Sequence, residues 1–448
     1  MTGSRIAIFG AGYAGLVTGA CFAELGHSVT IRDIVPEKIS ALQGGAVPIY
    51  EPGLEELIER NRERLRYTLD AAEAVRDAEL VFVCVDTPPT YSGDADLSRV
   101  WTVIEELPPS SERTILVMKS TVPVGTGEKV RAALDARGLD HVGYVSNPEF
   151  LAEGTALNDF LEPDRIVVGA FEEADAEAVA RLHAGIDAPI VKADVASAEM
   201  IKLASNAFLS TRISFINEIA NVCELVGADV VRVAEGIGLD HRLGPHFLRA
   251  GVGWGGSCYG KDASSLKQLA GNSGYHFQLL AAMIEVNELQ RRRVISKLQK
   301  HLGSLRGTTV ALLGLAFKPG TDDMRDAPSL VIASRLLAEG ADVRTWDPIA
   351  DARDRLVGAR QCDSVLDAVT GADAAVIVTE WDELRSLASP ETLGAMRRPL
   401  IIDGRNLLDP DDVRAAGFAY EGIGRASSAL DLLPETAEPD LREPARED

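Results

Sequence analysis

The sequence predicts an α/β protein with two doubly wound, parallel-sheet domains joined by a long central helix. Residues 5–33 read as strand, glycine-rich turn, amphipathic helix and second strand, which is the repeating unit of a parallel sheet. The same pattern returns from residue 307 onwards, and the stretch at 197–226 between the two copies lacks Gly and Pro. Both sheet domains are therefore expected to be Rossmann-like.

The strands of the two copies correspond to each other. AELVFVCVDTPP at 78–89 and RTILVMKSTVPVGT at 113–126 are apolar runs interrupted by proline, as expected for strands covered by helices on both faces. TTVALLGLAFKPG at 308–320 matches the first strand and turn, and RPLIIDGRN at 398–406 matches RTILVMKSTVP. This is an internal repeat of one nucleotide-binding unit.

The middle of the chain is predicted to be helical and to serve as a dimer interface. Apolar residues recur at helical spacing through 197–226, and a second long helix is expected around 277–302. The predicted division of the chain is a dinucleotide-binding domain at 1–195, a helical dimerisation and active-site domain at 196–300, a second, Rossmann-like nucleotide-binding domain at 301–428, and an acidic disordered tail at 429–448.

Composition and charge exclude several classes of function. The net charge of −23 argues against nucleic acid or an anionic membrane surface as a partner. No apolar run is long enough to span a membrane, and no signal peptide is recognised, so a cytoplasmic location is expected. The 5 cysteines are scattered and never in C-x-x-C spacing, which argues against a disulfide framework and against a metal site.

A dinucleotide fingerprint follows the first strand. Gly10, Gly12 and Gly15 form G-x-G-x-x-G between that strand and a helix, and Asp33 ends the next strand. Gly10 allows the tight turn, Gly12 lets a pyrophosphate approach the backbone, and Gly15 lets the helix pack on the strand. Asp33 would bond the adenosine ribose and repel a 2′-phosphate, so the predicted cofactor is NAD and not NADP.

The second copy lacks this fingerprint but carries basic residues at corresponding places. Lys318 follows the turn of its first strand, Arg325 lies just downstream, and Arg405 falls at the end of a later strand. Ligands of open α/β sheets bind at the carboxyl ends of the strands, and these charges suit phosphate. A second phosphorylated ligand is therefore expected in this half.

One glycine-rich segment leaves two readings open. GVGWGGSCYGKD at 251–262 holds Cys258 behind many glycines, with Lys261 and Asp262 just after it. It is either a flexible surface loop or a backbone folded closely against a ligand, with the thiol as nucleophile. Lys261 is expected to be solvated.

These segments resemble the UDP-glucose/GDP-mannose dehydrogenase family, the nucleotide-sugar dehydrogenases, and most of all the members that oxidise UDP-glucose. The resemblance runs from residue 5 to about residue 425. Its segments include GAGYAGLVTG, PIYEPGL, KSTVPVGT, NPEFLAEGTALNDFLEPDRIVVG, EMIKLASNAFLSTRISFINEIA, GVGWGGSCYGKD, LGLAFKPGTDDMRDAP and DGRN. The family converts the primary alcohol of a nucleoside-diphosphate hexose into a carboxylate, with two NAD and one cysteine.

The resemblance implies the catalytic residues. Cys258 matches the nucleophile, whose thiolate is expected to be favoured by a nearby lysine and by loop N–H groups. Lys202 and Asn206 share a helix face and match the residues that stabilise an oxyanion. Asp262 matches an acid that orders Lys202 and assists proton transfer. Two further matches are Glu149, which activates water on a thioester, and Thr121, which positions a water.

The resemblance also implies the binding residues. The implied NAD contacts are Gly10, Ala11, Gly12, Tyr13, Ala14, Gly15, Asp33, Lys38, Thr87, Pro88, Ser120, Thr121, Glu153 and Arg325. The implied UDP-sugar contacts are Glu149, Phe150, Leu151, Glu153, Lys202, Asn206, Arg242, Phe247, Leu248, Arg249, Gly251, Gly253, Gly255, Phe317, Lys318 and Arg405. Arg242 matches an arginine that reaches the substrate of the other subunit in a homodimer.

Several alternatives remain open. The same chemistry on GDP-mannose or on a UDP-N-acetylhexosamine depends on a few loop residues that one sequence separates poorly. A two-electron 3-hydroxyacid dehydrogenase shares this kind of N-terminal domain but lacks the second domain and the loop cysteine. A non-catalytic nucleotide-sugar sensor would have to lack the nucleophile or the lysine, and both residues are present.

Overall fold

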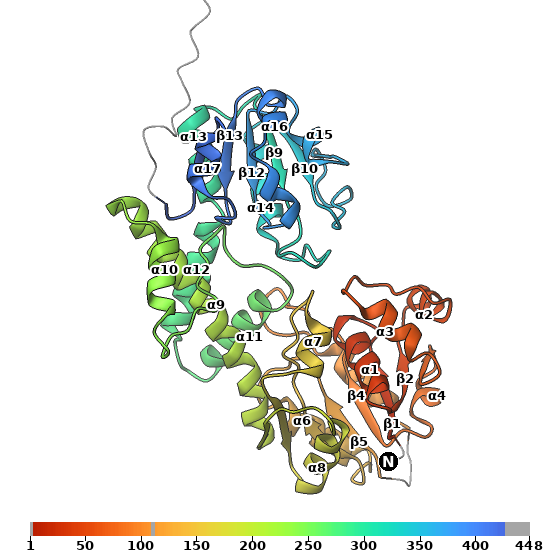
Figure 1. The fold of residues 1–448 in the computed structure, drawn as a ribbon. Coiled ribbons are helices and arrows are strands. Elements are labelled where there is room, and N and C mark those ends of the chain that lie inside the picture. Colours follow the sequence, from red (N-terminus) through yellow and green to blue (C-terminus); the bar gives the residue numbers. More distant parts are fainter. Residues whose placement is uncertain (1–2, 109–112, 426–448) are drawn as a thin grey trace, which may run out of the picture. The chain divides into compact units, whose positions relative to one another are not determined.

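The computed structural model of the 448-residue chain describes residues 3–108 and 113–425. The predicted tail at 429–448 lies outside the described residues. The chain divides into two compact units, whose elements are labelled in Figure 1. Unit 1 takes in Met1–Phe215, Trp254–Asn287 and Ala316–Ala327, and unit 2 takes in Ile216–Gly253, Glu288–Leu315 and Pro328–Asp448. The four-segment division drawn from the sequence stays a prediction.

Unit 1 is built on an eight-stranded sheet of order β3-β2-β1-β4-β5-β6-β7-β8. Its strands are β1 (Arg5–Phe9), β2 (Ser28–Arg32), β3 (Leu65–Thr68), β4 (Leu80–Val83), β5 (Ile115–Met118), β6 (Gly143–Ser146), β7 (Ile166–Ala170) and β8 (Ile190–Ala193). The order reverses direction between β1 and β4, which is the switch point of a Rossmann fold. The strands pair in parallel except for β6 with β7, which are antiparallel.

Both faces of this sheet are covered by helices. Ile6 and Ile8 of β1 pack into one apolar cluster, with residues of α1, α3, α7 and α8. Ala7 and Phe9 of the same strand pack into another, with residues of α5 and α6. The helices of unit 1 are α1 (Tyr13–Glu24), α2 (Pro36–Gln43), α3 (Leu54–Arg60), α4 (Ala71–Val75), α5 (Ser98–Glu106), α6 (Thr126–Ala136), α7 (Ala156–Leu161), α8 (Glu173–Leu182) and α11 (Tyr259–Asn272). Continuous burial along strands that are covered on both faces is what the apolar strand sequences predict.

Unit 2 contains a six-stranded sheet of order β11-β10-β9-β12-β13-β14. Its strands are β9 (Thr309–Leu313), β10 (Asp342–Trp346), β11 (Arg360–Gln361), β12 (Ala374–Ile377), β13 (Leu400–Asp403) and β14 (Ala419–Gly422). Its helices are α10 (Val230–Gly238), α13 (Arg293–Leu302), α14 (Pro328–Ala338), α15 (Val365–Val369), α16 (Pro390–Ala395) and α17 (Pro410–Ala415), with a 3₁₀ turn η1 at Asp382–Ser386. The strand order repeats that of β3-β2-β1-β4-β5-β6, so the predicted fold class is confirmed.

An aspartate organises the first turn of each sheet in the same way. In unit 1 the Asp33 carboxylate accepts a hydrogen bond from the N–H of Ala11, with 2.7 Å between Oδ2 and N. In unit 2 the Asp347 carboxylate accepts one from the N–H of Leu315, also at 2.7 Å. Each aspartate follows the second strand and holds the turn after the first strand, so the internal repeat extends to the hydrogen bonds of the turns.

Two long helices run from one unit into the other along the sequence. The first, α9 (Val195–Val226), has 32 residues without interruption, in agreement with the Gly- and Pro-free stretch predicted at 197–226. The second, α12 (Gln278–Gln290), is followed after a short turn by α13. Among the described residues, no helix combines the length and apolar character that a membrane crossing requires.

Within unit 2, hydrogen bonds between buried charged side chains link α13 to β14 and to α9. The Glu421 carboxylate accepts hydrogen bonds from Lys297 Nζ and Lys300 Nζ, each at 3.0 Å, and lies 2.6 Å from His301 Nε2. Lys297 Nζ also donates to Glu224 Oε1 of α9 at 2.7 Å. Burial alone would raise the pKa of Glu421, but His301 and Lys297 lower it to about 2.

Replacing Glu421 by Gln is expected to destabilise unit 2 by about 3 kcal/mol at neutral pH, because breaking a buried ion pair strands the remaining charges. The folded-state pKa lies below the ordinary value of 4.5, so the stabilisation is complete above pH 4.5 and is lost as the pH falls towards 2. Urea midpoints of wild type and E421Q, followed by tryptophan fluorescence, should converge on acidification. The exposed residue Glu339 provides the control E339Q. A difference between the urea midpoints of wild type and E421Q that increased at low pH would contradict the prediction.

Candidate active site

Cys258 lies at the start of helix α11, where it is the N-cap residue. Its side chain is half-buried, and its Sγ lies 3.6 Å from Ser257 Oγ. Burial raises the pKa of the thiol, and the charge of Lys202 offsets only part of that rise. The lysine thus favours the thiolate, as predicted, but the cost of desolvating the anion exceeds its attraction.

Lys202, on α9, forms an ion pair with Glu149, and both side chains are largely buried. Lys202 Nζ lies 2.9 Å from Glu149 Oε1, and the two side chains are 4% and 13% exposed. Burial would raise the pKa of Glu149, but Lys202 lowers it. Burial would likewise lower the pKa of Lys202, but Glu149 and the nearby Cys258 and Asp262 raise it. Both members of the pair are therefore charged at neutral pH.

Asp262 is held by Asn206 and Lys261. Asn206 Nδ2 donates to Asp262 Oδ2 at 2.6 Å, and Lys261 Nζ forms an ion pair with Oδ1 of the same carboxylate. The sequence predicted that Asp262 orders Lys202 and that Lys261 is solvated. The expectation for Lys261 is wrong, because its side chain is only 15% exposed. The hydrogen bond of Lys202 goes to Glu149, and the charge of Asp262 helps to raise the pKa of Lys202, so the predicted role of Asp262 stays a prediction. The Asp262 side chain is 1% exposed, so its charge must be compensated by nearby groups, and the ammonium of Lys261 compensates it.

Segment 316–327 packs against Glu153 and the cysteine loop. Thr321 Oγ1 donates to Glu153 Oε2 at 2.8 Å, and Arg325 Nη2 lies 3.3 Å from Glu153 Oε1. The carbonyl of Arg325 accepts the N–H of Gly256 at 2.9 Å. Burial, with the charge of Asp323, raises the pKa of Glu153 to about 7. The structure thus brings together the predicted cofactor residues Glu153 and Arg325.

The same segment brings Phe317 and Lys318 close to the cysteine loop. A side chain at Gly256 would meet the Phe317 ring, since a Cβ built there lies 2.9 Å from the ring. Lys318 is half-buried, burial lowers its pKa, and its Nζ lies 5.7 Å from the centre of the Phe317 ring. Within residues 3–108 and 113–425, Lys318 has no carboxylate at ion-pair distance. A desolvated amine of this kind suits an anionic ligand.

The glycine-rich turn of unit 1 has the geometry that a dinucleotide requires. Gly10 has a φ of +109°, and a Cβ at Gly15 would lie 1.8 Å from the carbonyl oxygen of Gly10. At Gly12, by contrast, the nearest atom to an added Cβ is 4.0 Å away, so the backbone is open to a ligand. Asp33 fixes this turn through its bond to Ala11. These observations fit NAD with its pyrophosphate at the start of α1.

Other predicted cofactor residues gather at the carboxyl ends of β4 and β5. Thr87 Oγ1 donates to the carbonyl of Thr121 at 2.8 Å, and Ser120 Oγ donates to the carbonyl of Val85 at 2.7 Å. These bonds tie the two strand ends together beside the switch point, where ligands bind. Pro88 is exposed and Lys38, on α2, is half-buried.

Two cations lie over the ring of Phe150. The guanidinium of Arg165 sits 3.6 Å from the centre of its ring, and Lys202 Nζ lies 5.4 Å from the same point. Leu151, the next residue, donates its N–H to Glu149 Oε2 at 2.6 Å. Arg165 was missed by the sequence prediction, although it lies in the segment NPEFLAEGTALNDFLEPDRIVVG that carries the resemblance.

Glu199 was also missed, although it lies on α9 one turn before Lys202. Its carboxylate accepts the N–H groups of Gly125 and Gly127, at 2.7 and 2.8 Å, at the start of α6. Burial raises the pKa of Glu199 to about 7. The spacing of Glu199, Lys202 and Asn206 at i, i+3 and i+7 was the available signal, because it places all three near one helix face.

The remaining predicted substrate residues belong to unit 2, except Gly255, which is buried in unit 1. They are Arg242, Phe247, Leu248, Arg249, Gly251, Gly253 and Arg405. Arg405 Nη1 donates to the carbonyl of Gly253 at 3.2 Å, and the exposed Arg242 pairs with Asp240. Leu248 is 5% exposed and packs in an apolar cluster, so its side chain is part of the core.

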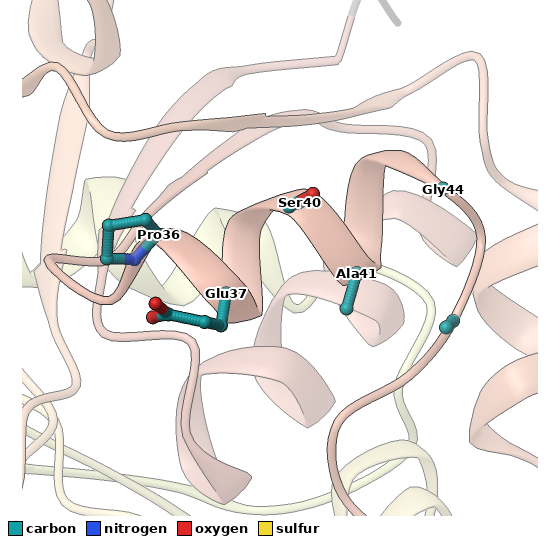
Figure 2. A pocket seen from close by; sticks show the side chains of 6 residues that line it. Pro36, Glu37, Ser40, Ala41 and Gly44 are labelled. Carbon is teal, nitrogen blue, oxygen red and sulfur yellow. The ribbon is translucent and has the colours of Figure 1, made fainter.

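A hollow of about 620 Å³ lies along α2 (Figure 2). It is lined by Pro36, Glu37, Ser40, Ala41, Gly44 and Ala46. Figure 2 shows that these residues come from one helix and the turn after it. None of the predicted cofactor or substrate residues lines it, so it does not enlarge the candidate site.

Comparison with protein families matches almost the whole chain. Residues 4–187 match the NAD binding domain of the UDP-glucose/GDP-mannose dehydrogenase family, residues 196–289 match its central domain, and residues 311–410 match its UDP binding domain. A UDP-glucose 6-dehydrogenase of Bacillus subtilis is 44% identical over 432 residues, which is 94% of this chain and 93% of that protein.

Solved structures agree with this result. A UDP-glucose dehydrogenase from Pyrobaculum islandicum superposes with a TM-score of 0.87 at 36% identity, covering 95% of this chain and 98% of that one. A UDP-D-ManNAc dehydrogenase from Pyrococcus horikoshii superposes with a TM-score of 0.85 at 30% identity, covering 95% and 100%. The chain therefore belongs to the UDP-glucose/GDP-mannose dehydrogenase family and is an NAD-dependent nucleotide-sugar dehydrogenase.

Proposed function

We propose that the protein oxidises UDP-glucose to UDP-glucuronate, with two NAD consumed per sugar and two intermediates carried on Cys258. The observation that supports this most strongly is the environment of the thiol. Cys258 lies within electrostatic reach of the buried Lys202–Glu149 pair and of Asp262. A nucleophile, a fixed cation and two carboxylates in one buried place are the groups that a thioester route requires.

The chemistry explains why a thiol is needed. Oxidation of a primary alcohol to a carboxylate removes four electrons, and each bound NAD supplies one acceptor for a hydride, that is, for two electrons. The first oxidation turns the C6 alcohol into an aldehyde, with loss of one hydride and one proton. Addition of the Cys258 sulfur to the aldehyde gives a thiohemiacetal, and loss of the second hydride and proton gives a thioester. Water then cleaves the C–S bond, releasing the carboxylate and restoring the thiol.

The buried charges fit the steps of this route. Lys202 and Asn206 would stabilise the negative charge that develops on the C6 oxygen, since both lie on α9 and point towards the acids of the site. Glu149, ionised in its pair with Lys202, would take the proton from the water that attacks the thioester. Asp262 orients Asn206 and would exchange protons with the reacting oxygen, and Thr121 would position a water.

The binding residues divide between cofactor and substrate. The turn at 10–15, with Asp33, would hold the dinucleotide, and Glu153 with Arg325 would lie at its reactive end. Lys318, half-buried and without an ion-pair partner within the described ranges, would meet the diphosphate of the sugar nucleotide. By the family resemblance, Arg405 would also bind the uridine diphosphate. The family match to a UDP binding domain at 311–410 supports a uridine nucleotide.

Parallel turnover assays on UDP-glucose, GDP-mannose and UDP-N-acetylglucosamine test the proposal. UDP-glucose should give the highest kcat/KM and release two NADH per sugar acid, because the aldehyde stays bound until the thioester forms. UDP-N-acetylmannosamine belongs in the panel, since the Pyrococcus horikoshii relative is a UDP-D-ManNAc dehydrogenase. One NADH per sugar with a free aldehyde would overturn the mechanism, and a higher kcat/KM on another sugar would overturn the substrate assignment.

We propose further that the protein is a homodimer. Helix α9 exposes Phe208, Phe215 and Val222, which are 64%, 52% and 52% accessible and lie seven residues apart. Large apolar side chains repeated along one helix are typical of a protein–protein interface. In that dimer Arg242 would reach the substrate of the other subunit. Light scattering should give twice the mass of one chain, and a single-chain mass at micromolar concentration would contradict the proposal.

A further inference from the structure

Glu51 is a buried carboxylate that the catalytic scheme leaves unused. It lies in the turn before α3 and is 6% exposed. Its Oε2 accepts the Tyr13 hydroxyl and, at 2.5 Å, the N–H of Gly154. Its Oε1 accepts the N–H of Ala156 at 2.7 Å. Within the described ranges it forms no ion pair, so three hydrogen bonds replace the cation that a buried carboxylate usually needs.

These hydrogen bonds join two parts of the active site that are far apart in sequence. Tyr13 is the first residue of α1, inside the glycine-rich turn that holds the dinucleotide. Gly154 lies in the loop that carries Glu149 and Glu153, and Ala156 is the first residue of α7, which follows that loop. The N–H of Gly154 also lies 3.1 Å from the Tyr13 hydroxyl oxygen, so Tyr13 and Glu51 converge on one point of this loop.

The loop is fixed from its other side as well. Gly154 has a φ of +85°, and an added Cβ there would lie 2.9 Å from the carbonyl oxygen of Gly320. The backbone at this point is thus confined between Glu51 and segment 316–327. A change at Glu51 can release the loop only on the side that faces the cofactor turn. Burial and the negative charge of Glu51 raise the pKa of Tyr13, so the hydroxyl stays protonated and remains a donor.

We propose that Glu51 is a positioning residue that couples the dinucleotide-binding turn to the loop of Glu149 and Glu153. It accepts hydrogen bonds from the N–H groups of Gly154 and Ala156 and from the Tyr13 hydroxyl, and these bonds fix the position of the loop relative to the glycine-rich turn. A shift of the loop by about 1 Å is enough to slow a reaction by one to two orders of magnitude. The proposal rests on the function proposed above, because it takes Glu149 and Glu153 to act on the sugar nucleotide.

Four variants test the coupling: E51Q, Y13F, the double variant, and E55Q as the control on an exposed acid four residues away. Gln keeps the shape of Glu but has a single acceptor oxygen, so it leaves one loop N–H facing an amide NH₂. E51Q should lower kcat with UDP-glucose roughly 10- to 100-fold at saturating NAD and raise the Kd of NAD roughly tenfold. E55Q should match wild type in both.

The Y13F variant carries the decisive result, since it leaves both loop N–H bonds to Glu51 in place and should fold. Its kcat at saturating NAD should fall about fivefold, although Tyr13 lies at the cofactor end, and the double variant should be no worse than E51Q alone. A loss of thermal stability in E51Q with unchanged kcat and Kd, or effects of the two changes that multiply, would overturn the coupling.

Calorimetric titration of NAD in the absence of sugar separates this proposal from the proposed function. If wild type oxidises none of the sugar nucleotides, the proposed function fails, while the titrations still report on Glu51 and Tyr13. In that case equal Kd values for wild type, E51Q and Y13F would overturn the coupling. Weakened binding in both single variants, with no further loss in the double variant, would support it.

Discussion

A Cys258→Ala variant is expected to form no sugar acid, with a loss of at least about 10³-fold in the rate of UDP-glucuronate production. The aldehyde cannot give up its second hydride until a nucleophile has added to it, and alanine offers none. NAD binding should be unchanged, because the glycine-rich turn and Asp33 lie elsewhere in unit 1. Product acid measured by chromatography and NAD affinity measured by calorimetry check both halves of this expectation.

Cys362→Ala is the matched control for that experiment. Cys362 is a cysteine of unit 2 that is 4% exposed, so its loss tests the general cost of removing a thiol without touching the site. Acid formation by C362A should stay near the wild-type rate. If C258A still produced acid at a comparable rate, the nucleophile would have to be another residue.

The protonation of the thiol gives the same experiment a second readout. Because burial raises the pKa of Cys258 above its usual value of 9.0, the thiol form dominates at neutral pH. Alkylation of Cys258 by iodoacetamide, followed by mass spectrometry of the peptide, should therefore be slow at pH 7 and accelerate above pH 9. A plateau reached below pH 8 would show that other groups favour the thiolate.

The second large effect is expected from Lys202→Ala. In the proposed mechanism, removing the lysine takes away the cation that stabilises the C6 oxygen, and it leaves Glu149 as an unpaired buried charge. The kcat should fall by roughly 10³-fold or more, and the free energy of unfolding should drop by about 3 kcal/mol. The pKa of Glu149 should rise, since burial is then no longer opposed by its partner.

A second substitution separates the two roles of Lys202. The double variant K202A/E149Q removes the stranded charge, so it should recover most of the lost stability in urea while staying inactive. Lys192→Ala is the control, because its pair with Glu177 is 43% and 44% exposed and surface pairs contribute little. Retention of activity by K202A, or an equal loss of stability in K192A, would contradict this account.

The sequence predicted the parts of the molecule that local patterns determine. Apolar runs of four or five residues, alternating with amphipathic segments, predicted both sheets, and the Gly- and Pro-free stretch predicted α9. The fingerprint at Gly10, Gly12 and Gly15 predicted the cofactor turn because each glycine has its own steric reason there. The antiparallel placement of β7 was not predictable from its own residues, since an apolar strand pairs equally well in either direction.

The partners of the buried charges lay beyond the reach of sequence. Lys202 faces Glu149 and not Asp262 because of how α9 lies against the loop after β6, and no spacing along the chain encodes this. Lys261 turned out to neutralise Asp262, although two adjacent residues on a helix do not normally face each other. Glu51 lies in PIYEPGL, one of the segments that carry the resemblance, but its partners could not be predicted, since its three hydrogen bonds come from residues about 40 and 100 positions away.

The bond between Asp33 and the turn of unit 1 has a consequence for protein engineering. Converting an NAD enzyme to NADP usually begins by replacing the acid that excludes the 2′-phosphate. Asp33, the residue predicted to exclude it here, also accepts the N–H of Ala11 and, through its other oxygen, the N–H of Val35 at 3.0 Å. Asp347 holds the corresponding turn of unit 2 through the N–H of Leu315, although the glycine fingerprint is absent there. A change of coenzyme in this scaffold would therefore begin with a new acceptor for those two amides, and only then with a cation for the phosphate.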